Sequence, residues 1–185
     1  MSGEGTDSEL VRTQAVTVLR AALLSRQGVA DALRACWYRH PLFASTLMSE
    51  SLRLRFPPGC DLRLVTAFVA RVRAGQGGAA GGFPGREAEA VIRACLGETA
   101  LLESVHPGQF SYPELGIAIL GRLFAEWHPD NAQLREWFEH VGRATVAMRE
   151  NSPALAGGEA DWYAAGMHQS PFAAPMDEAG RSEEA

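Results

Sequence analysis

Apolar residues recur at intervals of three and four along most of the chain, and no run shows sustained alternation of apolar and polar positions. This spacing is typical of amphipathic helices that pack one face on a core, whereas strands would show a period of two. The pattern therefore predicts an all-α fold, a compact bundle of about six helices within residues 8–150. Helical spacing occupies approximately residues 8–25, 29–38, 42–54, 62–74, 86–105, 115–127 and 132–150.

Two kinds of local signal predict where these helices begin and end. Ser111, Pro113 and Glu114 give the strongest start, because serine caps a helix, proline suits its first turn and glutamate completes a capping box. Histidine followed by proline recurs at predicted helix ends, where proline restricts the preceding residue and histidine complements the helix dipole. These His-Pro pairs are residues 40–41, 106–107 and 128–129.

The apolar faces also predict which helices are buried. The segment 115–127 is apolar nearly all round, which is typical of a helix in the middle of a bundle. In the segment 42–54, the spacing places Leu47, Ser51 and Leu54 on one side.

A glycine-rich stretch divides the predicted bundle. Residues 75–85 contain six glycines in eleven positions, a composition typical of a flexible linker. We therefore expect two helical halves, residues 8–74 and 86–150, after a flexible N-terminus at residues 1–7. Residues 151–185 lose periodicity and are rich in alanine, glycine, proline and acids, so we expect a disordered acidic tail.

The basic residues narrow the possible functions. All 17 are arginines, and without lysine the chain has no P-loop lysine, Schiff-base lysine or kinase ATP lysine. Ten of these arginines lie in residues 1–73 against six acids, but they are dispersed, and the whole chain carries a net charge of −5. Nucleic-acid binders concentrate basic charge on one face, so we expect a protein partner instead.

The cysteines predict a reducing environment. Three cysteines without a C-x-x-C pair do not form a disulfide framework. Cys36 and Cys95 lie in helical, partly apolar surroundings and are expected to be buried thiols, whereas Cys60 follows Pro-Pro-Gly in a loop and is expected to be reactive. With no membrane-spanning run and no leader pattern at the N-terminus, we expect a cytoplasmic protein.

One group of residues suggests an alternative function. Glu136 and His140 lie four residues apart on one predicted helix face, opposite the Trp137 stripe, and Glu126 and His128 are close in sequence. Metal sites in bundles need matching ligands that project inward from other helices, and no second such pair occurs. We expect neither metal nor cofactor. The alternative is a helical-bundle enzyme or a small-ligand or metal-binding domain with a pocket near these four residues.

The tail carries isolated aromatic residues that predict an interaction. Trp162, Tyr163 and Phe172 stand in an acidic segment, and exposed aromatics are costly unless they are used. The segment either folds on a partner or folds back over a gap in the bundle, and the sequence leaves both open.

We therefore predict a non-enzymatic protein-interaction module, a regulatory or adaptor protein that acts by helix-surface or tail docking. In the basic half, the expected partner-binding residues are Arg53, Arg55 and Arg63. Self-association through the last two helices is a further possibility, because Trp127, Trp137 and Phe138 offer large anchors.

Overall fold

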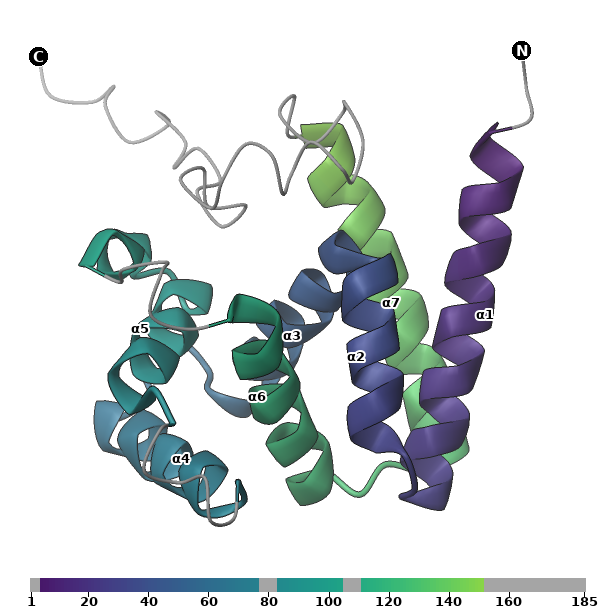
Figure 1. Ribbon diagram of the computed structural model, residues 1–185. Helices are drawn as coiled ribbons and strands as arrows, with labels where there is room; N and C mark the ends of the chain where they lie inside the picture. The colour runs from purple at the N-terminus through teal and green to yellow at the C-terminus, as the bar shows by residue number, and fades with distance from the viewer. Residues whose placement is uncertain (1–3, 77–82, 105–110, 152–185) are drawn as a thin grey trace, which may run out of the picture.

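The computed structural model describes residues 4–76, 83–104 and 111–151 (Figure 1). This part of the chain forms seven α-helices and one 3₁₀ helix and contains no strand, which confirms the all-α prediction. The elements are α1 (Glu4–Ser25), α2 (Val29–Arg39), α3 (Pro41–Arg55), α4 (Leu62–Ala74), α5 (Gly85–Cys95), η2 (Thr99–Ser104), α6 (Tyr112–Glu126) and α7 (Asn131–Asn151).

The segment 86–105, predicted as one helix, is two elements. α5 ends at Cys95, and Gly97 adopts a φ of +114°, which a side chain would disfavour. The backbone N–H of Glu98 then turns back to the carbonyl of Arg93 at 3.0 Å. The 3₁₀ helix η2 follows, so a single glycine interrupted an otherwise continuous helical pattern.

Helix α3 occupies the centre of the bundle. It packs against α2, α5, α6 and α7, and every residue from Pro41 to Ser49 is buried (Figure 1). The prediction placed residues 115–127 in the middle, and α6 is indeed mostly buried. Leu47 and Ser51 are buried, whereas the side chain of Leu54 is 61% exposed, because the last turn of α3 continues beyond the packed part of the helix.

Small and hydroxylated side chains allow α3 to be buried on all sides. Ser45, Thr46 and Ser49 lie among larger apolar residues and are fully enclosed. The Thr46 hydroxyl donates to the Leu42 carbonyl at 2.8 Å, which satisfies it within its own helix. These residues look polar in the sequence, so the pattern suggested an amphipathic helix with one exposed side.

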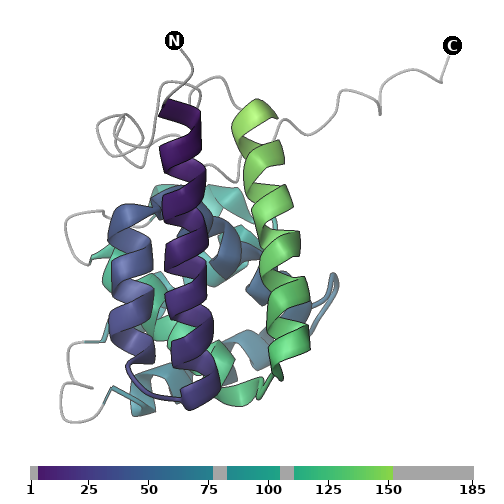
Figure 2. The ribbon, with the colours of Figure 1, turned by 90° about the vertical axis from the view of Figure 1, so that its right-hand side faces the viewer.

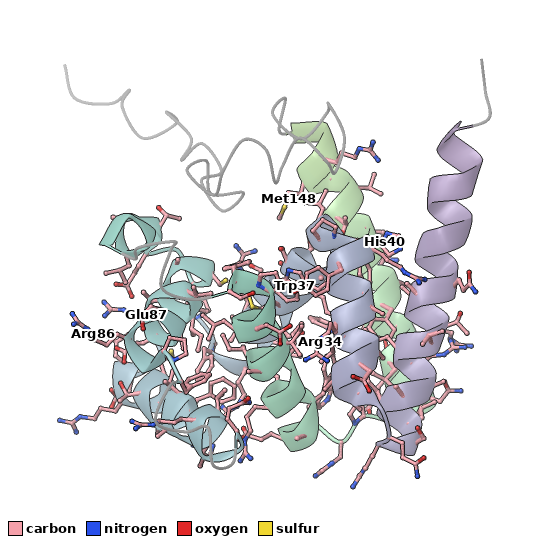
Figure 3. All side chains as sticks on the ribbon, in the orientation of Figure 1. Arg34, Trp37, His40, Arg86, Glu87 and Met148 are labelled. Atoms are coloured by element: carbon pink, nitrogen blue, oxygen red, sulfur yellow. The ribbon has the colours of Figure 1, made fainter. Side chains whose placement is uncertain are left out.

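Helices α2 and α6 make the closest contact in the core. Trp37 is fully buried between them, and an added Cβ at Gly116 would lie 2.0 Å from its ring (Figure 3). Tyr112 meets the Trp37 ring edge-on, with 5.7 Å between centroids. Glycine at position 116 therefore lets the indole lie directly on the α6 backbone.

The start of α6 agrees with the sequence in position but not in chemistry. Ser111 is the N-cap residue and Pro113 lies in the first turn, as predicted. Glu114 does not complete a capping box. Its two carboxylate oxygens accept hydrogen bonds at 3.1 Å from Nε and Nη2 of Arg34 on α2. The glutamate thus joins two helices. The hydrogen bond from Arg34 lowers the pKa of the Glu114 carboxyl, and this effect outweighs the opposing effect of burial.

The two predicted halves share one hydrophobic core. α2 packs on α6 and α3 packs on α7, while α1 and α7 lie side by side on one face of the molecule (Figure 2). Most of the predicted linker, residues 77–82, lies outside the described residues, as do residues 1–3 and the tail from 152 onwards. The division into halves therefore stays a prediction.

None of the described helices is long and apolar enough to span a membrane.

Replacing Gly116 with alanine tests the contact between α2 and α6. The added methyl group would collide with the Trp37 ring, so we expect the free energy of unfolding to fall by about 2–3 kcal/mol. Gly121→Ala on the same helix is the matched control, because nothing lies within 4 Å of its added Cβ. That variant should gain about 0.5–1 kcal/mol from helix propensity. Urea unfolding of both variants measures the difference, and equal stabilities would contradict the packing described here.

Candidate functional site

A pocket of about 390 Å³ lies between the C-terminal turns of α3 and α6. Ser51, Leu123 and Phe124 are buried within it, while Leu54 and Trp127 are more exposed at its edge. We call it the α3–α6 groove, and its lining residues are Ser51, Leu54, Arg55, Leu123, Phe124, Glu126 and Trp127. Its volume lies in the range of sites that bind small ligands or anchoring side chains.

Three arginines from three helices surround one carboxylate at the groove. Nε of Arg71 and Nε of Arg122 each donate to Oε1 of Glu126 at 2.8 Å. Nε of Arg55 lies 3.7 Å from Oε2, which is an ion pair beyond hydrogen-bond distance. We call Arg55, Arg71 and Arg122 the arginine rim. Because one negative charge faces three positive ones, the cluster keeps a local excess of two positive charges.

The arginine rim holds Glu126 in its charged form. Burial raises the pKa of the Glu126 carboxyl, but hydrogen bonds and charge from Arg71 and Arg122 outweigh this, so that its pKa is lowered. Arg55 and Arg71 also lie over the rings of Phe56 and Phe68, at 5.2 and 5.7 Å from the centroids. These cation–π contacts keep the guanidinium groups near the protein surface.

A row of aromatic rings leads from the groove onto α7. The Phe124 and Trp127 rings stack at 6.0 Å, and Trp127 meets Trp137 edge-on at 5.9 Å. The His140 ring then stacks on Trp137 at 5.2 Å. We call these four residues the aromatic row. Trp127 and Trp137 are only partly buried, so the row continues the apolar surface of the groove.

The helix pattern predicted that His140 lies on the side of α7 opposite Trp137, but the two rings are stacked. In addition, Nε2 of His140 lies 2.9 Å from Oε2 of Glu50 on α3. Glu50 also accepts a hydrogen bond at 2.9 Å from Arg53. The prediction is wrong because Trp137 and His140 are three residues apart, a spacing that makes side chains neighbours on one helix face. Helix α3 packs on α7 and brings its own charges to this face.

The predicted metal candidates are not brought together. His128 and Glu136 are exposed, and the His140 ring contacts the Glu50 carboxylate. In the ranges that the structure describes, no three His, Cys, Asp or Glu residues are placed to hold a metal ion. Of the four residues in the alternative pocket, only Glu126 lines the groove.

The predicted partner-binding residues fall in different places. Arg55 lines the groove, whereas Arg53 bonds to Glu50 and to the Cys95 carbonyl at 3.3 Å. Arg63 is exposed on the first turn of α4, where Asp61 caps its backbone N–H. The remaining three predicted residues, Trp162, Tyr163 and Phe172, lie outside the described part of the chain.

One of the proposed self-association anchors is not available at the surface. Phe138 is buried, with its ring 6.5 Å from that of Phe43. Trp127 and Trp137 are partly exposed, and both belong to the aromatic row.

Sequence reasoning missed most of the groove. Leu123 and Phe124 were assigned only to a buried helix, and Arg71 and Arg122 carried no distinguishing motif. One signal was available: Arg122 and Glu126 have the i,i+4 spacing of a helical ion pair. Nothing in the sequence pattern showed that Arg71 and Arg55 would join them.

The buried thiols agree with the sequence prediction. Cys36 and Cys95 are buried, and Cys60 is partly exposed. Burial raises the pKa of the Cys95 thiol to about 12, despite the opposing charge of Arg53. Burial likewise raises the pKa of the neighbouring Tyr112 phenol. Both groups are therefore protonated at neutral pH and unsuited to nucleophilic catalysis.

No family model matches the sequence, and neither the curated proteins nor the solved structures give a significant match.

Thiol labelling tests the assignment of the cysteines. With a thiol-specific disulfide reagent at pH 7.5, Cys60 should react at least about tenfold faster than Cys36 and Cys95, because it is partly exposed and they are buried. All three should react at similar rates in urea. Peptide mass spectrometry identifies the labelled positions, and early labelling of Cys95 would contradict its burial.

The pH dependence of stability tests the cluster at Glu126. Its pKa is lowered on folding, so the charged carboxylate stabilises the fold above the ordinary value of 4.5, and this contribution is lost as pH falls through the folded-state pKa. Glu126→Gln should therefore reduce the free energy of unfolding by about 1 kcal/mol at pH 7. The difference from wild type should shrink between pH 5 and pH 3.

Glu136→Gln is the control for this experiment, because Glu136 is an exposed carboxylate on α7. Its stability should follow that of wild type at every pH. If the effect of Glu126→Gln did not change with pH, the ion-pair cluster would not be its cause.

Proposed function

We propose that this protein is a non-enzymatic interaction module that binds an acidic, aromatic-containing segment of a protein partner in the α3–α6 groove. One observation carries the proposal: an apolar pocket lies directly beside three arginines that share a single carboxylate. The apolar pocket and the three arginines recognise different features of the same partner segment.

The apolar part of the groove suits a large anchoring side chain. Leu54 exposes 61% of its surface at the edge, and Trp127 presents a partly buried indole beside it. Interfaces derive most of their binding energy from a few aromatic or aliphatic anchors that enter such pockets. An aromatic side chain of the partner would cover Leu54 and extend the aromatic row.

The arginine rim supports selection for negative charge. Each guanidinium carries five N–H donors, and the contacts to Glu126 use only the Nε donors of Arg71 and Arg122. Nη1 of Arg71 also donates to the Ala67 carbonyl at 3.3 Å. The other Nη groups make no contact with Glu126 within the described residues, and arginine can direct such donors to a carboxylate in a bidentate manner. Because the local charge excess is positive, an acidic segment is attracted and a basic one is repelled.

A regulatory or adaptor role in the cytoplasm is the broader proposal that these features support. Cys36, Cys60 and Cys95 form no disulfide, a state that fits a reducing compartment.

One observation favours a second candidate, a small amphipathic anion as ligand. Ser51 lines the pocket, and its enclosed hydroxyl has no hydrogen-bond partner within the described residues. A ligand that turns this side chain toward the pocket could satisfy the hydroxyl with a polar atom. Native mass spectrometry of the full chain, purified from its own host, would show such a ligand as added mass that is lost in Arg55→Glu.

Selection from a random peptide display library tests the proposed function. With the full chain as bait, we expect enriched peptides that combine an aromatic residue with two or more acidic residues. Their affinity should fall at least about tenfold in Leu54→Asp and in Arg55→Glu, because these changes remove the apolar edge and reverse one charge of the rim.

Arg143→Glu is the matched control, since it reverses an exposed arginine on α7. It should leave peptide affinity within twofold of wild type. Urea unfolding checks that all variants are folded. Enriched peptides without acidic residues, or equal affinity for Arg55→Glu and wild type, would overturn the proposal.

A further inference from the structure

We infer that the α3–α6 groove is occupied by a segment of this same chain, residues 159–163 (Glu-Ala-Asp-Trp-Tyr), which competes with the partner. The inference rests on the proposed function, because it assigns a competing occupant to the same groove. Three independent arguments support it: side-chain chemistry, charge and the length of the connecting chain.

The chemistry of this segment matches that of the groove. Trp162 and Tyr163 are adjacent aromatic residues, and the acids Glu159 and Asp161 precede them directly. The groove offers the complementary features, which are an apolar pocket next to Trp127 and the arginine rim. Phe172 is a poorer match, because its nearest acid, Asp177, is five residues away.

Charge favours the groove over other arginine clusters in the described part of the chain. Arg34 faces two carboxylates, those of Asp31 and Glu114. Arg93 likewise faces Glu89 and Glu98. Around Glu126 the ratio is reversed, with three arginines for one carboxylate. Residues 152–185 carry six acids and a single arginine, so this strongly acidic tail is attracted to a cluster that keeps a positive excess.

The connecting chain is long enough to reach the groove. Helix α7 runs antiparallel to α6, so it begins near the groove and ends at Asn151 at the opposite end of the bundle (Figure 1). Trp127 at the groove touches Trp137, and the 14 residues from Trp137 to Asn151 span about 21 Å of helix. The 11 residues from Asn151 to Trp162 can extend up to about 36–40 Å. The tail can therefore run back along α7 to the pocket.

Docking within one chain has a direct consequence for partner binding. A segment tethered by a short linker has an effective concentration in the millimolar range, so even a weak contact fills the groove much of the time. A partner must then displace the segment, and its apparent affinity is reduced by the fraction of closed molecules. Any process that removes or modifies the tail would open the groove.

Photo-crosslinking in the full chain tests the contact itself. With Trp162→p-benzoyl-Phe, we expect light-induced crosslinks to peptides that contain residues 51–55 or 123–127. The yield should fall at least fivefold in Arg55→Glu and stay unchanged in Arg143→Glu, and the same probe at Phe172 should crosslink the groove much less. No crosslinks, or crosslinks only to other parts of the core, would overturn the inference.

Mixing ¹⁵N-labelled and unlabelled protein before illumination distinguishes docking within a chain from docking between chains. Crosslinks in which both joined peptides carry the same isotope support the inference. Crosslinks that join a labelled to an unlabelled peptide at the statistical fraction, about half in an equimolar mixture, would overturn it in favour of exchange of tails between two copies.

Peptide affinity in the full chain separates this inference from the proposed function. Trp162→Ala with Tyr163→Ala should bind a groove-selected peptide about tenfold more tightly than wild type, whereas Phe172→Ala should not differ. If peptides bind through Arg55 but the double variant shows no gain and no crosslink forms, only the tail inference fails. If crosslinks form at the groove while no display peptide binds even the double variant, the tail inference holds and the proposed function fails.

Discussion

The complete burial of α3 is the constraint on which the rest of the structure depends. A helix that is enclosed from Pro41 to Ser49 must be covered on every side, and α2, α5, α6 and α7 supply that cover. Its small residues Ala44, Ser45 and Ser49 let these neighbours approach closely. The groove follows from the same arrangement, because Leu54 and Arg55 extend past the enclosed part and leave an edge beside α6.

Glu126 connects the fold to the proposed function. Its carboxylate draws together arginines from α3, α4 and α6, which would otherwise repel one another. One carboxylate stabilises this cluster without neutralising it. The remaining positive charge lies next to an apolar pocket, and this combination distinguishes the groove from the exposed ion pairs elsewhere on the described surface, such as that of Arg34 with Asp31 and Glu114.

The path of the chain gives the groove two possible occupants. Because α7 runs from the groove to the opposite end of the bundle, an acidic segment that follows Asn151 can return to the place where the helix began. A partner segment with the same chemistry would compete for the same arginines. Binding and self-occupation are then opposite outcomes of one equilibrium, which a change in tail charge or length would shift.

Local patterns in the chain were sufficient to predict the helices, several of their ends and the burial of Cys36 and Cys95. Spacing, caps and prolines act within a few residues, so they can be recognised without knowledge of the fold. Gly97, the exposure of Leu54 and the groove could not be predicted in this way. Glu126 meets Arg71 across 55 residues, and His140 meets Glu50 across 90. Such contacts arise when helices pack, because packing selects which of many similar charged side chains become neighbours.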